Sequence, residues 1–138
     1  LMQLSNGGGQ KNAFNSRDDY LFLKKLQEDN KVIPLTGDFA GPRALTEVAN
    51  YLNEHKLTVT AYYVSNVEQY LFRNWVFPAW ANNIKKLPLA DKSVFIRWSA
   101  SGYRATRLQY MENFVKNFDG GKYYSYEDLN YYDYIIKK

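Results

Sequence analysis

The strongest constraint on this chain is a pattern in which a short β-type run leads directly into a helical one, and it occurs twice. Residues 57–64 are rich in β-branched and aromatic side chains, and residues 65–72 continue as a helix. Residues 31–36 form a continuous apolar run closed by turn residues at 37–42, and apolar side chains then recur at helical spacing up to His55. Strands that alternate with helices predict an α/β fold with a largely parallel sheet.

Further elements complete this expected α/β domain. A third strand is expected over 93–98, and the glycine-bearing residues 1–15 are expected to form a flexible arm or loop before a single domain or half-domain at 16–138. The predicted architecture has three layers, with helices on both faces of a mostly parallel sheet. The further expected helices are one from Ser16 to Asn30, one over 75–87, one bearing Leu108, Met111, Phe114, Val115 and Phe118, and one that opens at Ser125.

Composition excludes several kinds of chemistry. The 138 residues contain no cysteine and one histidine, so disulfides, thiol nucleophiles and Cys-bound metals are ruled out. The net charge is +4, but the basic residues are scattered, so nucleic-acid binding is not expected. No apolar run approaches the ~18 residues of a membrane span. The compartment is left open.

Three strands are few for a buried parallel sheet, because each inner strand needs a neighbour for its backbone groups. The first strand therefore lacks a partner on one side. The chain begins with Leu rather than Met, so upstream sequence is one expected partner. Upstream sequence is favoured, and a second identical subunit or the glycine-bearing arm are the alternatives.

Ligands of open α/β sheets bind beyond the carboxyl ends of the strands. The polar residues expected there are Asp38, Asn66, Glu68, Arg97 and Tyr103, which we select as a possible small-molecule site, with Asp38 as the catalytic candidate. Arg97 ends an otherwise apolar strand, where its guanidinium can bind a carboxylate or phosphate.

Each of these residues also has a structural interpretation. Asp38 can cap a turn, Glu68 can close a capping box with Ser65, and Arg97 can pair with Asp38 or Glu68. Arg104 and Arg107 would share one helix face. His55 is interpreted as a capping or surface residue. Six of the 13 tyrosines fall in the last sixteen residues and are expected to cover the sheet or a subunit interface.

Several stretches resemble an uncharacterised bacterial family described as methyltransferase-like. They are residues 32–45, 63–72, 87–88 and 95–97, within a resemblance that spans 16–138. The resemblance implies the second half of a Rossmann-like, S-adenosylmethionine-dependent fold. The cofactor-binding half would then lie upstream, and this chain alone would bind no cofactor.

The resemblance also implies roles on the methyl-acceptor side for Asp38, Asn66 and Arg97. The leading hypothesis is therefore a methyltransferase-like fragment of unproven activity with a small-molecule site at the strand ends. The alternative is a non-enzymatic binding or self-associating module that uses the open sheet edge and the tyrosine-rich surface, including Tyr131 and Tyr134.

Overall fold

The computed structural model of the chain describes residues 16–99 and 105–131. The chain divides into two units, Leu1–Leu35 and Thr36–Lys138, and each is described by itself. Among the described helices, none has both the length and the apolar character needed to cross a membrane.

The first unit contains α1 (Arg17–Glu28), whose boundaries confirm the sequence prediction. Ser16 is the N-cap, and its hydroxyl accepts a hydrogen bond from the backbone N–H of Asp19 at 3.1 Å. This bond satisfies one of the N–H groups that a helix start leaves unpaired. Asn30 follows the helix with a φ of 53°, a left-handed conformation that commonly ends helices. None of the helix residues is buried.

The strand expected over residues 31–36 is wrong, because residues 31–38 have no regular secondary structure. Val32, Ile33 and Leu35 are all about half exposed or more. Pro34 also lacks the N–H that a strand ladder requires. The run therefore has neither the burial nor the hydrogen bonds of an inner parallel strand.

The second unit begins with the elements that the sequence predicts. Its two parallel strands are joined through two short helices. The predicted helices and strands are confirmed here, with ends that shift by a few residues. In chain order, the elements are α2 (Ala44–Glu54), β1 (Val59–Ser65), α3 (Val67–Arg73), α4 (Phe77–Ile84) and β2 (Leu89–Ser99).

A hairpin follows β2 and corrects the prediction for this region. β3 (Ala105–Tyr110) pairs antiparallel with β2 and places Arg107 opposite Arg97. Leu108 was expected on a helix but lies on β3, and α5 (Met111–Asp119) begins only after it. The pairing gives hydrogen-bond partners to the backbone groups along the second side of β2. The spacing of apolar residues along the sequence cannot indicate such a long-range contact.

The expected C-terminal helix appears in the described residues only as a single 3₁₀ turn, η1 (Glu127–Asn130). Asp128 stabilises its start, because the carboxylate accepts hydrogen bonds from the backbone N–H groups of Tyr124 and Ser125. The N-cap residue of η1 is Tyr126, which makes no side-chain capping bond, so Ser125 is not the cap that the sequence predicts. Residues 132–138, where the predicted helix continues, lie outside the described part of the chain.

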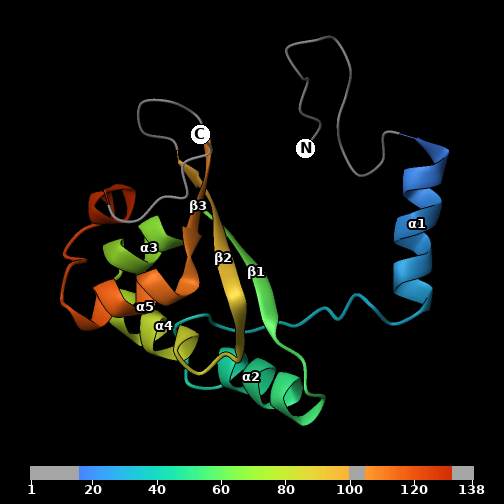
Figure 1. The fold of residues 1–138 in the computed structure, drawn as a ribbon, viewed down its shortest axis with the longest axis horizontal. Coiled ribbons are helices and arrows are strands. Elements are labelled where there is room, and N and C mark those ends of the chain that lie inside the picture. Colours follow the sequence, from blue (N-terminus) through green and yellow to red (C-terminus); the bar gives the residue numbers. More distant parts are fainter. Residues whose placement is uncertain (1–15, 100–104, 132–138) are drawn as a thin grey trace. The chain divides into compact units, whose positions relative to one another are not determined.

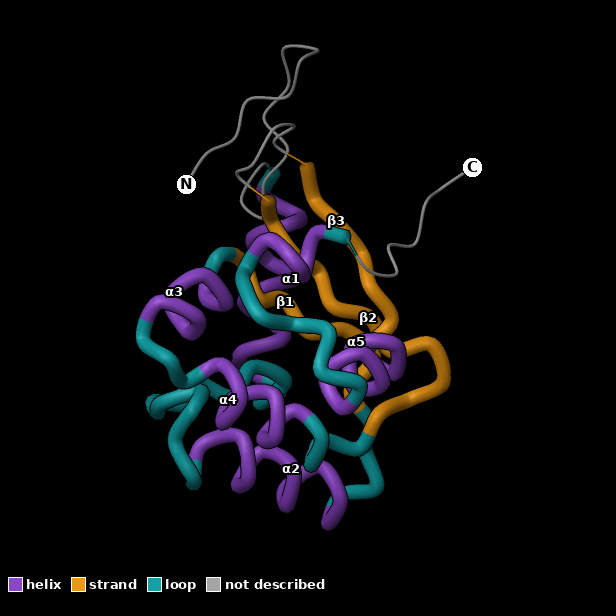
Figure 2. The backbone as a smooth tube through the Cα atoms, turned by 90° about the vertical axis from the view of Figure 1, so that its left-hand side faces the viewer, coloured by secondary structure: helices purple, strands orange, loops and turns teal. Residues whose placement is uncertain are grey.

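The sheet has the order β1-β2-β3, with one parallel and one antiparallel pairing. Figure 1 shows α3, α4 and α5 together on one face of this sheet, and Figure 2 views the unit from that helical side. The α/β class is confirmed. The expected third layer is not found among the described residues of this unit, and the sheet is mixed rather than mostly parallel.

The core lies between this sheet and its helices and is mainly aromatic. Trp80 of α4, Phe95 of β2 and Phe114 of α5 are completely buried. The ring centroids of Phe95 and Phe114 are 5.0 Å apart, and those of Trp80 and Phe114 are 5.5 Å apart, both within the favourable range for aromatic pairs. These rings fix each helix against the sheet.

We expect Trp80→Ala to lower the free energy of unfolding by about 3–5 kcal/mol, because it leaves a large cavity in the core. Trp75→Ala is the matched control, since Trp75 is 91% exposed and should contribute within about 0.5 kcal/mol. Urea denaturation followed by far-UV circular dichroism measures both. Equal losses in the two variants would contradict this packing.

Candidate functional site

Glu68 and Arg97 form a buried ion pair between the first turn of α3 and the end of β2. The Arg97 Nε donates to both Glu68 carboxylate oxygens, at 3.0 and 2.7 Å. Glu68 is completely buried and Arg97 is 4% exposed. Side chains alternate along a strand, so Arg97 shares the core-facing side of β2 with Ser93 and Phe95.

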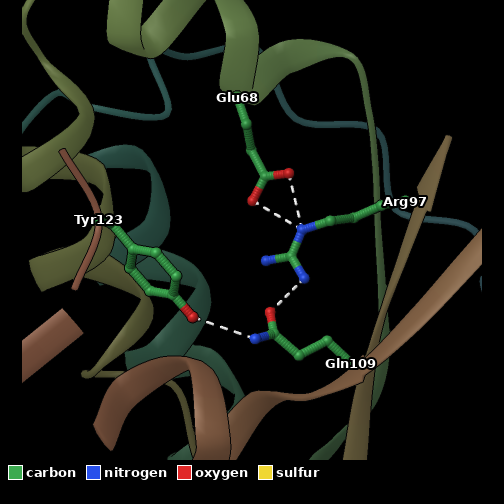
Figure 3. Close-up of polar contacts among 4 residues, drawn as sticks. All are labelled: Glu68, Arg97, Gln109 and Tyr123. Carbon is green, nitrogen blue, oxygen red and sulfur yellow. Dashed lines mark hydrogen bonds and ion pairs between the residues drawn. The ribbon is translucent and has the colours of Figure 1, made fainter. Parts of the chain in front are cut away.

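The pair continues into a chain of hydrogen bonds that joins four segments (Figure 3). Arg97 Nη1 donates to the Gln109 side-chain oxygen, and Gln109 Nε2 donates to the hydroxyl of Tyr123 at 3.0 Å. Gln109 lies on β3, and Tyr123 follows α5. The network therefore links α3, both strands of the hairpin and the segment that leads to η1.

Aromatic rings line the remaining space around the guanidinium. The Arg97 Cζ is 4.3 Å from the centroid of the Phe95 ring and 5.5 Å from that of Phe114. A cation over an aromatic face is attracted by the ring electrons. Arg97 Nη2 is buried without a hydrogen bond to any described residue. Burial keeps this ion pair from contacting a ligand unless the surrounding side chains move.

Tyr62 of β1 is a partly buried polar group near Glu68. Burial raises the pKa of its hydroxyl above the ordinary value, and the negative charge of Glu68 raises this pKa further. The nearby indole N–H of Trp80 lowers this pKa by more than the charge of Glu68 raises it, but by less than burial raises it. Tyr62 is therefore a neutral hydroxyl at physiological pH.

The capping box expected from Ser65 and Glu68 is wrong. The N-cap of α3 is Asn66, and no side chain makes a capping hydrogen bond there. Glu68 turns inward to Arg97 instead, because an uncompensated guanidinium in the core would cost several kcal/mol. The sequence was compatible with Arg97 pairing with Asp38 or with Glu68, and the structure shows the pair with Glu68.

Asp38 lies apart from this network in the turn before α2. Its carboxylate accepts a hydrogen bond from the backbone N–H of Ala40 at 2.9 Å. Asn83 of α4 donates to the backbone oxygens of Phe39 and Gly41, at 3.1 and 2.7 Å, and fixes this turn. The structural interpretation of Asp38 as a turn carboxylate is confirmed, and its catalytic role remains a prediction.

The other candidates are distributed differently. Asn66 is partly exposed directly after β1, where its amide can meet solvent or a ligand. Tyr103 and Arg104 lie outside the described residues. Arg107 lies on β3, so the predicted helix face shared by Arg104 and Arg107 is wrong.

The histidine and the tyrosines also have defined surroundings. The Nδ1 of His55 lies 2.8 Å from the Tyr51 carbonyl oxygen, and the two rings stack with centroids 4.1 Å apart. This confirms His55 as a residue that satisfies the end of α2. Tyr124 and Tyr131 are strongly exposed, while Tyr134 lies outside the described residues. In the described residues, no group of three or more His, Asp and Glu side chains could hold a metal ion.

Sequence reasoning missed Gln109 and Tyr123, the outer members of the network. The helix predicted from Leu108 to Phe118 includes Gln109, and that prediction does not bring its side chain to Arg97. Once β3 is placed antiparallel to β2, Phe95 pairs with Gln109 and the glutamine faces the core. A polar residue between apolar neighbours on a strand was the available signal.

We expect Glu68→Gln to lower the free energy of unfolding by about 3 kcal/mol, because it leaves Arg97 charged and uncompensated in the core. The matched control is Glu112→Gln, which breaks an exposed pair with Lys116 and should change stability little. The double variant Glu68→Gln, Arg97→Met should lose less free energy of unfolding than the two single variants lose in sum, as measured by urea denaturation. Additive losses would contradict a coupled pair.

Comparison with known proteins identifies the family of the chain. No curated protein matches the sequence. Residues 1–135 match a family described as a domain of unknown function, DUF7790. Neither finding names a methyltransferase, so that resemblance remains a prediction. Because the match spans nearly all of the 138 residues, this chain belongs to the DUF7790 family.

Proposed function

We propose that this chain is a non-enzymatic binding module that pairs the outer edge of β1 with β1 of a second copy. The observation that carries this proposal is the composition of β1, an edge strand of seven residues without any charged residue or proline. Exposed edges of this kind readily pair with another strand, and natural proteins usually protect them with charges, proline or short length.

The opposite edge differs from β1. β3 is shorter, contains Arg107 and continues directly into α5. A charged side chain and a short strand both discourage edge pairing. The comparison favours β1 as the edge that takes a partner.

The face of the sheet away from the helices supports the same proposal. Tyr63 of β1 is 66% exposed on this face, and Ile96 of β2 and Leu108 of β3 are partly exposed. Pairing two copies through β1 would join their two faces into one wider apolar surface. A patch of this kind is typical of protein interaction sites.

A second copy is the partner that the strand chemistry favours. An antiparallel pair of identical strands is two-fold symmetric, and uncharged strands bring no like charges together. β1 pairs regularly with β2 only from Ala61 to Tyr63, with irregularities on both sides. We therefore place the two-fold axis at Tyr62, so that Ala61 of one copy faces Tyr63 of the other.

The methyltransferase-like function is the second candidate. The parallel pair of β1 and β2, joined through α3 and α4, is the kind of unit that half of a Rossmann-like fold would contribute. S-adenosylmethionine would then be held by an upstream half. Against catalysis by this piece, Glu68 and Arg97 are already engaged with each other.

We expect native mass spectrometry to show a dimer of the wild-type chain whose population rises with protein concentration. Substituting both Ala61→Lys and Tyr63→Lys should give a monomer, because like charges would face each other across the pair. Combining Ala61→Glu with Tyr63→Lys should restore the dimer, since opposite charges would then face each other. Tyr124→Lys is the control, because Tyr124 is an exposed tyrosine in the segment between α5 and η1.

A monomeric wild-type chain at all concentrations would contradict the proposal. A dimer that the charge-swapped variant fails to restore would overturn the pairing centred at Tyr62. A wild-type spectrum that retains S-adenosylmethionine would favour the methyltransferase-like candidate instead. Thermal unfolding should confirm that each variant is folded.

A further inference from the structure

A cavity of about 470 Å³ opens beside the start of β2, and none of the functions above uses it. Its walls come from the first residues of β2, the end of β3 and the first turn of α5. This volume lies within the range of small-molecule sites in proteins.

An irregularity in the sheet creates the cavity. From Val59 to Ala61, β1 advances two residues, while β2 advances five residues from Leu89 to Val94. Three residues of β2 therefore loop out of the sheet. The Ser93 hydroxyl lies 2.6 Å from the Val59 carbonyl oxygen and 2.7 Å from that of Ala90, and it can donate to either. This contact closes the neck of the loop.

The tip of this loop carries two opposite charges. Asp91 and Lys92 both line the cavity, and both side chains are exposed. Neither side chain has a hydrogen bond or an ion pair with another described residue. Lys92 has a φ of 62°, a left-handed conformation. Two unpaired opposite charges at one cavity suit a ligand that carries both charges itself.

The opposite wall adds a second carboxylate. Glu112 of α5 lines the cavity and contacts Lys116 at 2.7 Å. The hydrogen bond from Lys116, reinforced by its charge, lowers the pKa of Glu112 below its ordinary value. Glu112 is therefore ionised at neutral pH. The cavity also has apolar lining from Leu89, Ala90 and the ring of Tyr110.

We propose that this cavity binds a free α-amino acid with an apolar side chain. Lys92 takes the carboxylate of the amino acid, and Asp91 and Glu112 take its ammonium group. Leu89 and Tyr110 contact the side chain. This site involves neither the outer edge of β1 nor the proposed pairing, so each can fail without the other.

L-Phenylalanine is the probe for this proposal. Titration into ¹⁵N-labelled protein should shift the amide resonances of Asp91, Lys92 and Asn113 in a saturable way. Phenethylamine, which lacks the carboxylate, and 3-phenylpropionate, which lacks the ammonium group, should each bind at least about tenfold more weakly. No saturable shift up to about 10 mM phenylalanine, or equal binding of phenethylamine, would overturn the proposal.

Substitutions at the two charges test the same point. Lys92→Gln and Asp91→Asn should each weaken phenylalanine binding about tenfold, with the melting temperature little changed. Lys56→Gln is a closely matched control, because Lys56 is also an exposed lysine with a positive φ, 55°. Unchanged affinity in Lys92→Gln, or an equal loss in Lys56→Gln, would contradict a specific carboxylate contact.

Discussion

The architecture of the second unit depends on how it accommodates a charged guanidinium in an aromatic core. The Arg97 guanidinium lies against the rings of Phe95 and Phe114, where an uncompensated charge would cost several kcal/mol. Glu68 neutralises it, and Gln109 takes a further donor. These contacts require α3, β2 and β3 to hold one relative position, so the ion pair restricts the register of the hairpin as well as the position of the helix. We infer that the ion pair contributes more to selecting one packing arrangement than to the free energy of unfolding.

Covering only one face of the sheet leaves the other face and the edge strand β1 with few restraints. The helices satisfy the apolar side chains that point inward from each strand, such as Val64 and Phe95. The side chains that alternate with them, including Tyr63, keep much of their exposure. Backbone groups along the outer side of β1 likewise have no strand beside them in the described sheet. A neighbouring strand would satisfy these backbone groups, which is why we favour pairing over catalysis.

Local signals predicted most elements, and long-range pairing accounts for the errors. The N-cap at Ser16 and the strands β1 and β2 depend on neighbouring residues, so the sequence alone indicated them. β3 passes into α5 without a turn residue between them, and Leu108 happens to match the helical spacing of the residues that follow. The run at 31–36 failed for the opposite reason, since its composition suits a strand but no neighbour pairs with it. Neither the strand at β3 nor the absence of a strand at 31–36 can be predicted from neighbouring residues alone.

The candidate site shows the same limit at the level of single residues. An arginine at the end of an apolar strand indicated that Arg97 needed an anionic partner, and two carboxylates were compatible with it. Choosing Glu68 over Asp38 required knowing that the residues before Asp38 form no strand, because only a strand there would have brought Asp38 to the same sheet edge. The partner of a buried charge is therefore decided by topology, and the topology is decided in part by that charge. Sequence reasoning can identify such a residue before it can identify the contact.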